Sequence, residues 1–551
     1  MADPTKSASA SITIVPTVVV TVTPANVSVS AGSSQQFTAS VAGTSNTAVD
    51  WTVSGTGCSG AACGTINSSG LYIAPAAIPS PDTVTVTAAS VTNSGKSASA
   101  KITIESAPSE SVTYFLAPAA DGGSDSNSGT SIDSPWLTPN HYVNCGDVII
   151  AAASTSYVAT NFTYGKWGTV TCPEGNNVAW LKCVTFDACK FTANGSYVAM
   201  AVTESYWGVQ GWEVTSIGET DACFTAYPAA GVEIHHIIFA NDIANGCYLS
   251  GFQSGNNGDA GIDYLVVVGT ITYNASQTSV ACASGIDIYQ PVQSDSLPGT
   301  HIYIAGNFSW ANFDANPCAG GAPSDGEGVI LDTLDGSQGG LPSPYAAQVV
   351  VDNNILIANG GRGFQVFNNS AGSAHAAIYV RHNTVWGNNG DLKETNNLCG
   401  EMLISASLNV QEFFNIAATN ATKGCGGYPL YAYYVANGGP ADLVYDDIGY
   451  SATDTDSDIK DSTGFSYGPN NLFGTDPSFA NATAPEAPSC SNASSVPNCM
   501  AKVIADFTPT ASGSTGYGYQ IPNAASVSDP LFPKWLCNVN LPPGLVTMGC
   551  L

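Results

Sequence analysis

Charged side chains are scarce in this sequence, and basic ones are the scarcest. Only 10% of the 551 residues are charged, and 13 Lys and Arg face 42 Asp and Glu, which gives a formal net charge of −29. A chain with this surplus of acid repels nucleic acid and anionic membrane surfaces, so we expect neither as a partner. The same shortage makes a local positive group conspicuous. Both arginines of the chain, Arg362 and Arg381, lie within one short region.

Long apolar runs and zinc-type cysteine spacings are also missing. No stretch reaches the ~20 apolar residues of a membrane span, and the first residues, MADPTKSASA, lack the apolar centre of a signal peptide. The sixteen cysteines contain no CxxC pair, which argues against a zinc or thioredoxin-like redox site. Their even number and short separations predict disulfides, and hence a secreted or cell-surface protein whose export is directed by a segment outside this chain.

Neighbouring cysteines are the natural disulfide partners, but the sequence fixes only Cys58–Cys63, which are alone in their domain. The other neighbours are Cys145/Cys172, Cys183/Cys189, Cys223/Cys247, Cys282/Cys318, Cys399/Cys425, Cys490/Cys499 and Cys537/Cys550.

An internal repeat marks the start of the chain. KSASASITI (6–14) returns as KSASAKITI (96–104), and the second copy ends a run of strands with apolar residues at alternate positions. The run VTPANVSVSAGSSQQFTASV…GTINSSGLYIAP…VTVTAAS resembles bacterial Ig-like domains of group 2 over 19–105. The resemblance implies that 1–18 are the remnant of a preceding Ig-like repeat, and that the parent protein carries further copies. A donor strand for a neighbouring molecule is the alternative.

A polar linker, 106–111, leads to a second kind of repeat. Three segments, 302–312, 349–359 and 378–388, share one frame with apolar residues at period two. In stacked coils, asparagine amides at equivalent positions can hydrogen bond along the axis. Two columns show this pattern: Asn307, Asn354, Asn383 and Asn312, Asn359, Asn388.

These patterns predict an all-β chain in which a right-handed parallel β-helix over 112–480 follows the N-terminal sandwich. Residues 481–551 lose the coil pattern and are rich in proline and cysteine. We expect them to form an irregular, disulfide-tied cap that covers the last coil, whose open strand edges would otherwise invite aggregation.

Each coil carries another strand within 285–290, 328–333, 363–368 or 401–406. Stacking these strands in register sends alternate side chains into the core. The inward columns are Ile286, Val329, Phe364, Met402 and Ile288, Leu331, Val366, Ile404. The outward rows are Asp287, Ile330, Gln365, Leu403 and Tyr289, Asp332, Phe367, Ser405. Exposed aromatic and apolar residues beside carboxylates indicate a sugar-binding groove. The expected substrate-binding residues are Tyr289, Gln365, Phe367 and Trp310.

The two arginines have different expected partners. Arg362 follows Glu327 by one coil, so stacking at about 4.8 Å makes them neighbours. Arg362 either forms an ion pair that closes two turns, or binds or deprotonates a sugar acid. Arg381 shares the frame of Asp352, which predicts a salt bridge between coils.

The coil pattern from 114 to about 480 resembles the pectate-lyase-like superfamily, and its Gly-led strands with Asn-rich turns are most similar to polysaccharide lyase family nine. Enzymes of that kind remove the proton next to a uronic acid carboxylate, with calcium on aspartates and a Lys or Arg as base. The lysine of that family falls here on Ile330 or Gln365, and only Asp287 matches its aspartate cluster. Arg362 would have to replace the lysine from a neighbouring position.

The resemblance also implies calcium, which prefers six to eight oxygen ligands. The candidate ligands are Asp325, Glu327 and Asp335. Asp325 and Asp335 each precede a glycine, so both are alternatively turn residues. No phosphate loop or nucleotide fingerprint occurs, so we expect no organic cofactor.

Three functions remain open. We expect a secreted bacterial monomer that cleaves a uronic-acid polysaccharide by β-elimination. The first alternative is an inverting glycoside hydrolase, because Asp287 and Asp332 would lie about 8 Å apart, within the window for that mechanism. The second is a non-catalytic carbohydrate-binding or adhesive module. The candidate catalytic residues are Arg362, Asp287, Asp332 and Glu327.

Overall fold

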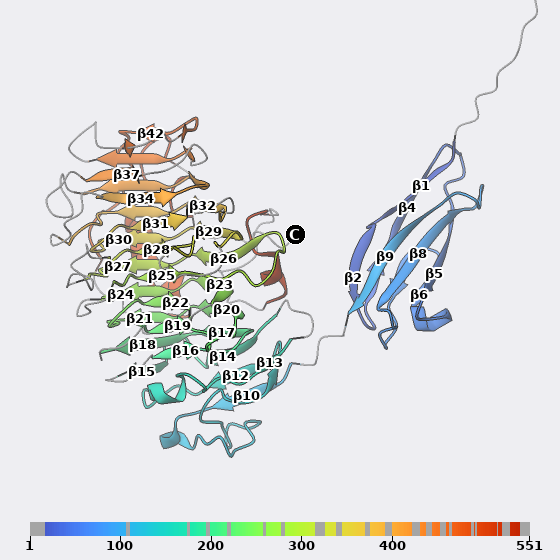
Figure 1. Ribbon diagram of the computed structural model, residues 1–551, viewed down its shortest axis with the longest axis horizontal. Helices are drawn as coiled ribbons and strands as arrows, with labels where there is room; N and C mark the ends of the chain where they lie inside the picture. The colour runs from blue at the N-terminus through green and yellow to red at the C-terminus, as the bar shows by residue number, and fades with distance from the viewer. Residues whose placement is uncertain are drawn as a thin grey trace, which may run out of the picture. The chain divides into compact units, whose positions relative to one another are not determined.

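The chain forms two compact units, Met1–Glu110 and Ser111–Leu551, in a computed structural model (Figure 1). Each unit is described by itself. The structure describes residues 17–105, 111–172, 177–193, 199–217, 222–256, 260–276, 282–314, 325–337, 344–369, 375–391, 399–420, 430–436, 443–451, 459–461, 466–485, 490, 493–514, 516–520 and 529–539.

The first unit consists of small sheets that share one core. The sheet orders are β1-β4, β2-β9-β8-β5 and β3-β7-β6. The predicted alternation is confirmed in β8, where Val84, Val86 and Ala88 are buried and the residues between them are half-buried. Cys58–Cys63 is closed, with an S–S distance of 2.05 Å. The elements are β1 (Val19–Thr23), β2 (Asn26–Ser30), β3 (Ser34–Gln36), β4 (Thr38–Ala42), β5 (Val49–Gly55), η1 (Gly60–Cys63), β6 (Thr65–Ile66), β7 (Leu71–Ile73), β8 (Thr83–Ser90) and β9 (Ser97–Glu105).

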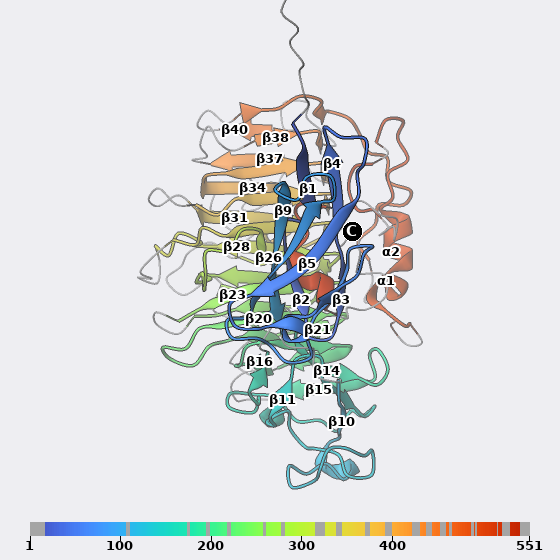
Figure 2. The same cartoon turned by 90° about the vertical axis from the view of Figure 1, so that its right-hand side faces the viewer.

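The second unit is the predicted right-handed parallel β-helix. Three long sheets run along it, and every strand pair within them is parallel (Figures 1 and 2). The twelve-stranded sheet contains β10 (Thr113–Leu116), β12 (Val148–Ala151), β14 (Ala179–Cys183), β17 (Trp207–Gln210), β20 (Ile234–Ala240), β23 (Ile262–Val268), β26 (Thr300–Ala305), β29 (Gln348–Asp352), β32 (Ile378–Arg381), β35 (Val410–Phe413), β38 (Leu443–Tyr445) and β41 (Ser466–Tyr467).

Two further sheets complete the coils. The ten-stranded sheet contains β15 (Cys189–Ala193), β18 (Trp212–Ser216), β21 (Ile243–Asn245), β24 (Ile271–Tyr273), β27 (Phe308–Trp310), β30 (Ile355–Ile357), β33 (Thr384–Trp386), β36 (Ile416–Thr419), β39 (Ile448–Ser451) and β42 (Leu472–Phe473). The nine-stranded sheet contains β16 (Met200–Val202), β19 (Phe224–Ala226), β22 (Phe252–Ser254), β25 (Ile286–Tyr289), β28 (Val329–Asp332), β31 (Phe364–Asn369), β34 (Gly400–Ser407), β37 (Tyr431–Ala436) and β40 (Ile459–Asp461). The remaining elements are the pair β11 (Val143–Asn144) and β13 (Val170–Thr171), the turns η2 (Ala119–Asp121), η3 (Ala159–Asn161) and η5 (Lys534–Asn538), and the helices α1 (Val496–Cys499) and α2 (Ala501–Asp506).

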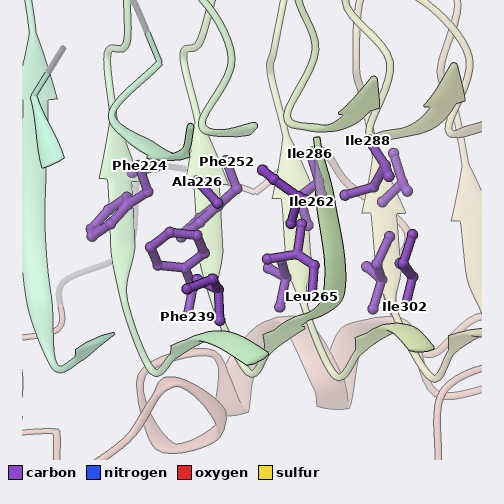
Figure 3. Packing of buried hydrophobic residues seen from close by; sticks show 14 of the residues in the cluster. Phe224, Ala226, Phe239, Phe252, Ile262, Leu265, Ile286, Ile288 and Ile302 are labelled. Atoms are coloured by element: carbon purple, nitrogen blue, oxygen red, sulfur yellow. The ribbon is translucent and has the colours of Figure 1, made fainter. Parts of the chain in front are cut away.

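The core fills the interior of the coils with stacked side chains. Figure 3 shows Phe224 and Phe252 of the nine-stranded sheet facing Phe239 of the twelve-stranded sheet. The rings of Phe224 and Phe252 stack with centroids 4.7 Å apart, which equals the spacing of adjacent strands. Repeating the same residue type in successive coils therefore builds the core.

Both predicted asparagine columns are confirmed as hydrogen-bonded ladders. Asn307 donates its amide to Asn354 at 3.0 Å, and Asn354 donates to Asn383 at 2.8 Å. This ladder continues beyond the prediction through Asn415 and Asp447. Each amide pairs with its neighbour, so a buried polar column adds order without leaving those groups unsatisfied.

The second ladder ends on a carboxyl group. Asn312 donates to Asn359 at 3.0 Å, Asn359 donates to Asn388 at 2.9 Å, and Asn388 donates to Glu401 at 2.7 Å. Burial raises the pKa of Glu401 to about 8, although the hydrogen bonds from Asn388 oppose the shift. Glu401, which lies in β34, therefore accepts the last hydrogen bond of this ladder.

Left-handed turns set the place of each ladder residue. The residue before the ladder position has a positive φ in successive coils, with values of 66° at Gly306, 59° at Asn353 and 52° at His382. Glycine and asparagine adopt this conformation at low cost. The turn repeats, so the next side chain points inward in every coil.

The C-terminal segment packs along the side of the β-helix. α1 and α2 lie alongside the middle of the stack in Figure 2. Their apolar residues, among them Val496 and Met500, pack on Phe308 and Ile355 of the ten-stranded sheet. Phe532 and other residues of 531–539 pack on the twelve-stranded sheet. These contacts place described parts of the segment along the coils, because the outer faces of both sheets carry apolar side chains that need cover. That the segment covers the last coil stays a prediction.

Arg381 joins two coils and this segment. Its guanidinium donates to Asp352 at 2.8 and 3.0 Å, which confirms the predicted bridge between coils. It also pairs with Asp529 of the C-terminal segment. The side chain is only 12% exposed, so the bridge lies beneath the surface.

Disulfides close neighbouring turns of the chain. Five of the eight neighbour pairs are formed: Cys58–Cys63, Cys145–Cys172, Cys183–Cys189, Cys223–Cys247 and Cys490–Cys499. Cys282, Cys399 and Cys537 are also disulfide-bonded, and their expected partners Cys318, Cys425 and Cys550 lie outside the described residues. Over the described ranges, no helix is both long and apolar enough to span a membrane.

Candidate functional site

The outer face of the nine-stranded sheet carries the side chains singled out in the sequence. Ile286, Val329, Phe364 and Met402 pair in one inward column, which fixes the alternate residues as outward. The predicted register is therefore confirmed. The outward rows are Asp287, Ile330, Gln365, Leu403 and Tyr289, Asp332, Phe367, Ser405.

The apolar side chains of the first row are buried, which corrects the expectation of an exposed apolar surface. Ile330 is 3% exposed and Leu403 is 0% exposed. Leu403 packs against Tyr434 of the neighbouring strand β37. Burial explains why these residues stand in an outward row without harming solubility. The accessible part of the face is the half-buried row of Tyr289, Asp332 and Phe367.

Asp287 and Asp332 are the carboxyl groups on these rows. Asp287 pairs with Ile330 and Asp332 pairs with Tyr289, so the two acids are one coil and two residues apart. Asp287 is 7% exposed. Burial and then the negative charge of Asp332 raise the pKa of Asp287 well above its usual range. Burial therefore favours the protonated form of Asp287.

The pKa of Asp332 is also raised above the usual value of an aspartate. Burial raises its pKa to about 6, and the negative charges of Glu327 and Asp335 add to the shift. The hydroxyl of Thr333 opposes it by donating a hydrogen bond to Asp332 at 2.6 Å. The two carboxyl groups therefore stand in different surroundings, which suits the separate tasks of a general acid and a general base.

Two buried polar atoms of this face have no hydrogen-bond partner among the described residues. They are Asp287 Oδ1 and Gln365 Oε1, on side chains that are both 7% exposed. The other oxygen of Asp287 accepts a hydrogen bond from Gln253 Nε2 at 3.1 Å. An unsatisfied buried polar group costs about 1–3 kcal/mol, so a cluster of them indicates groups that a ligand would satisfy.

A hydrogen-bonded chain links Asp287 to Arg362 across the coils. Asp287 accepts from Ser250 Oγ at 3.4 Å, and that hydroxyl accepts the backbone N–H of Ser284 at 3.2 Å. Ser284 Oγ donates to one oxygen of Glu327 at 2.8 Å, and Arg362 donates to the other at 2.9 Å. Arg362 is 2% exposed and Glu327 is 0% exposed. This geometry favours the ion pair that closes two turns over contact with substrate.

Glycines at equivalent positions of successive coils lie between the residues of this hydrogen-bonded chain and the strands that follow them. A Cβ on Gly328 would lie 2.6 Å from the carbonyl oxygen of Gly363 and 3.0 Å from the amide nitrogen of Asn359. A larger residue would therefore push the coils apart. These glycines bring Glu327 and Arg362 into adjacent coils at the same height.

Replacing Arg362 by lysine should destabilise the fold more than it slows any reaction. Lysine keeps the charge but loses hydrogen bonds of the planar guanidinium to a buried carboxylate, a loss of about 1.5–3 kcal/mol. Turnover should fall less than about tenfold. Urea unfolding and initial rates measure the two effects, with Arg381→Lys as the matched control. A turnover loss above a hundredfold with unchanged stability would give Arg362 a role in chemistry.

Two members of the acidic run at 325–335 accept hydrogen bonds within the described residues. Both oxygens of Glu327 accept hydrogen bonds, one of them from a guanidinium. Asp335 Oδ1 accepts the backbone N–H of Ser337 at 3.0 Å, which is the alternative turn role. Burial and neighbouring negative charges raise the pKa of Asp325 well above its usual range. No cluster of three or more His, Cys, Asp or Glu that could hold a metal occurs in the described parts of the chain. We therefore give calcium no role in the proposed reaction.

Trp310 does not belong to this face. It lies in β27 of the ten-stranded sheet, where it is 2% exposed and stacks on Tyr273 with ring centroids 5.1 Å apart. Val496 and Met500 of the C-terminal segment pack in the same apolar cluster. The expectation that Trp310 binds substrate is therefore wrong, because a segment nearly two hundred residues later in the sequence covers the indole.

Sequence reasoning missed the residues of β22 and its preceding turn. Gln253 pairs with Asp287 in register, and Ser250 lies where Ser284 and Glu327 lie in the next coils. The signal was present, since SGFQS (250–254) has the same Gly-led pattern as SGIDI (284–288).

No protein-family model matches the chain, and no curated protein matches it.

Proposed function

We propose that the outer face of the nine-stranded sheet hydrolyses a polysaccharide, with Asp287 as general acid and Asp332 as general base. The observation that carries the proposal is the pair itself. Two carboxyl groups stand on adjacent strands of one face, and one of them, Asp287, is buried with one oxygen that has no hydrogen-bond partner among the described residues. Their separation of about 8 Å, from strand spacing and rise, leaves room for the water of an inverting reaction.

The two acids suit opposite tasks. Burial favours the protonated form of Asp287, which would donate its proton to the leaving glycosidic oxygen. Asp332, with a pKa of about 6, would accept a proton from the attacking water. Inversion follows because the water enters from the face opposite to the bond that breaks. Gln253 holds the second oxygen of Asp287 by a hydrogen bond at 3.1 Å.

β-Elimination is supported less well, although the sequence favours it. That reaction needs a base beside the sugar carbon, and a guanidinium with a solution pKa above 12 does not act as one readily. Arg362 is in addition buried against Glu327, 2.9 Å from its carboxylate. Elimination therefore stays a second candidate that the same assay tests.

The first unit serves as an immunoglobulin-like spacer of a secreted bacterial protein. Three sheets around one core support this assignment, as does the resemblance over 19–105. Five disulfides among the described residues fit an extracellular location. The β-helix carries the chemistry.

The products distinguish the possible reactions. The full chain, incubated with a panel of polysaccharides, should release reducing ends without the ultraviolet absorbance of unsaturated uronides. The anomeric configuration of the first product, followed by proton NMR, should be inverted. Reducing ends with ultraviolet absorbance would establish elimination instead, and a retained anomer would contradict the roles of Asp287 and Asp332. Binding without products would leave a carbohydrate-binding module.

A further inference from the structure

Uncharged amides and aromatic rings flank the two acids. Gln253 pairs in register with Asp287 on one side, and Gln365 lies beyond Ile330 on the other. Gln365 Oε1 is buried without a partner among the described residues, and Gln253 carries an amide Nε2 beside Asp287. A carbonyl oxygen and an N–H donor match sugar hydroxyls, which accept and donate hydrogen bonds.

The aromatic rings stand on either side of Asp332. Tyr289 pairs with Asp332 on one neighbouring strand, and Phe367 pairs with it on the other. Both rings are half-buried, so part of each remains open to a ligand. A polysaccharide that runs along the axis would place its rings on Tyr289 and Phe367 with Asp332 between them.

The charges that act on this face are negative. Glu327 and Asp335 act on Asp332, while Asp332 and Asp287 act on Tyr289. Arg362 lies just before β31 and is the positive group next to these strands. It is buried and paired with Glu327. A substrate carboxylate would therefore meet repulsion from several acids and no accessible cation among these residues.

We propose that the polysaccharide taken by this face is uncharged around the cleaved bond, with neutral sugars bound through hydroxyl groups to the glutamine amides and stacked on Tyr289 and Phe367. This inference rests on the proposed hydrolysis and narrows its substrate class. It replaces the uronic-acid polysaccharide expected from the sequence, which depended on an accessible Arg362.

Affinity electrophoresis of the full chain and of its Asp287→Asn variant tests the substrate class. The gels contain an uncharged polysaccharide (galactomannan, xyloglucan, arabinan or mixed-linkage β-glucan) or a uronate (polygalacturonate, alginate or hyaluronan). At least one uncharged polysaccharide should retard both proteins, with a dissociation constant at least tenfold below that for every uronate. A uronate that binds as tightly, or the absence of binding to every uncharged polysaccharide, overturns the inference.

Two controls separate this inference from the proposed reaction. Binding of an uncharged polysaccharide without release of reducing ends would remove the hydrolase and keep the substrate class. Release of reducing ends from a uronate alone would keep the hydrolase and overturn the inferred substrate class. Phe367→Ala should weaken binding about tenfold, whereas Phe413→Ala, on β35 of the twelve-stranded sheet, should not. Equal losses in the two variants would contradict the assigned face.

Discussion

Replacing Asp287 by asparagine should lower turnover on a cleaved polysaccharide by about 10²–10⁴, which is the usual contribution of a general acid or base. The fold should survive, because burial and the charge of Asp332 favour the neutral form of Asp287, and asparagine is also neutral. Asparagine keeps the size of the side chain and an oxygen for the hydrogen bond from Gln253. Urea unfolding should therefore change little while the rate collapses.

The pH dependence of kcat/KM gives an independent reading of the same pair. Activity requires Asp332 ionised, so it should fall as pH drops below about 6. It requires Asp287 protonated, so it should fall again as pH rises through the raised pKa of that group. Asp332→Asn should remove the acidic limb together with most of the activity.

Asp335→Asn provides the matched control for this profile. Asp335 lies three residues from Asp332, and its negative charge raises the pKa of Asp332. Removing that charge should move the acidic limb to lower pH and leave the maximum rate nearly unchanged. Full activity in Asp287→Asn, or a profile that Asp335→Asn does not move, would contradict the assigned roles.

The solenoid could be predicted because its signals repeat in the sequence. Asn307, Asn354 and Asn383 recur in one frame, and each makes the same hydrogen bond to the next coil. Alternation in β25 and β28 fixed which side chains point outward, so Asp287 and Asp332 were placed on one face from the sequence alone. A stacked repeat makes neighbours in space out of equivalent positions, and this rule needs no knowledge of distant contacts.

What escaped prediction depends on contacts that do not repeat. Trp310 has an outward aromatic signal, but α1 and α2 cover it from the C-terminal part of the chain. The pairing of Arg381 with Asp529 spans 148 residues and has no periodic signature. The burial of Arg362 escaped for a different reason, since sequence spacing gives its partner Glu327 but not its exposure. The burial of Arg362 is the reason why we propose hydrolysis rather than elimination.

Asp263→Asn should be among the most destabilising single substitutions in the β-helix. Asp263 is 0% exposed, and its carboxylate accepts hydrogen bonds from His301 Nδ1 at 3.0 Å, from Tyr345 Oη at 2.6 Å and from Ser294 Oγ at 2.9 Å. His301 is 1% exposed and donates its other ring nitrogen to the carbonyl oxygen of Leu297 at 3.0 Å. Two donating ring nitrogens make His301 an imidazolium, so the pair is a buried salt bridge.

The loss should be about 3–5 kcal/mol of unfolding free energy, because removing one partner leaves the other charge buried and unpaired. Lys502→Met, which breaks the exposed pair with Asp506, should change stability little. Urea unfolding of the two variants at pH 5.5 measures the difference. Comparable small losses in both would contradict a charged Asp263–His301 pair.

The same pair sets the pH range of stability. Burial alone would raise the pKa of Asp263, but the hydrogen bond and charge of His301 lower it below the ordinary value. The contribution of Asp263 to the free energy of unfolding is therefore lost only as pH falls through that lowered pKa. Burial alone would lower the pKa of His301, but Asp263 raises it above 6.5, so its contribution is lost as pH rises through the raised pKa. The wild-type chain should therefore lose stability as pH rises from 6.5 through the raised pKa of His301, and Asp263→Asn should not show that decline. Parallel decline in both proteins would place the titrating group elsewhere.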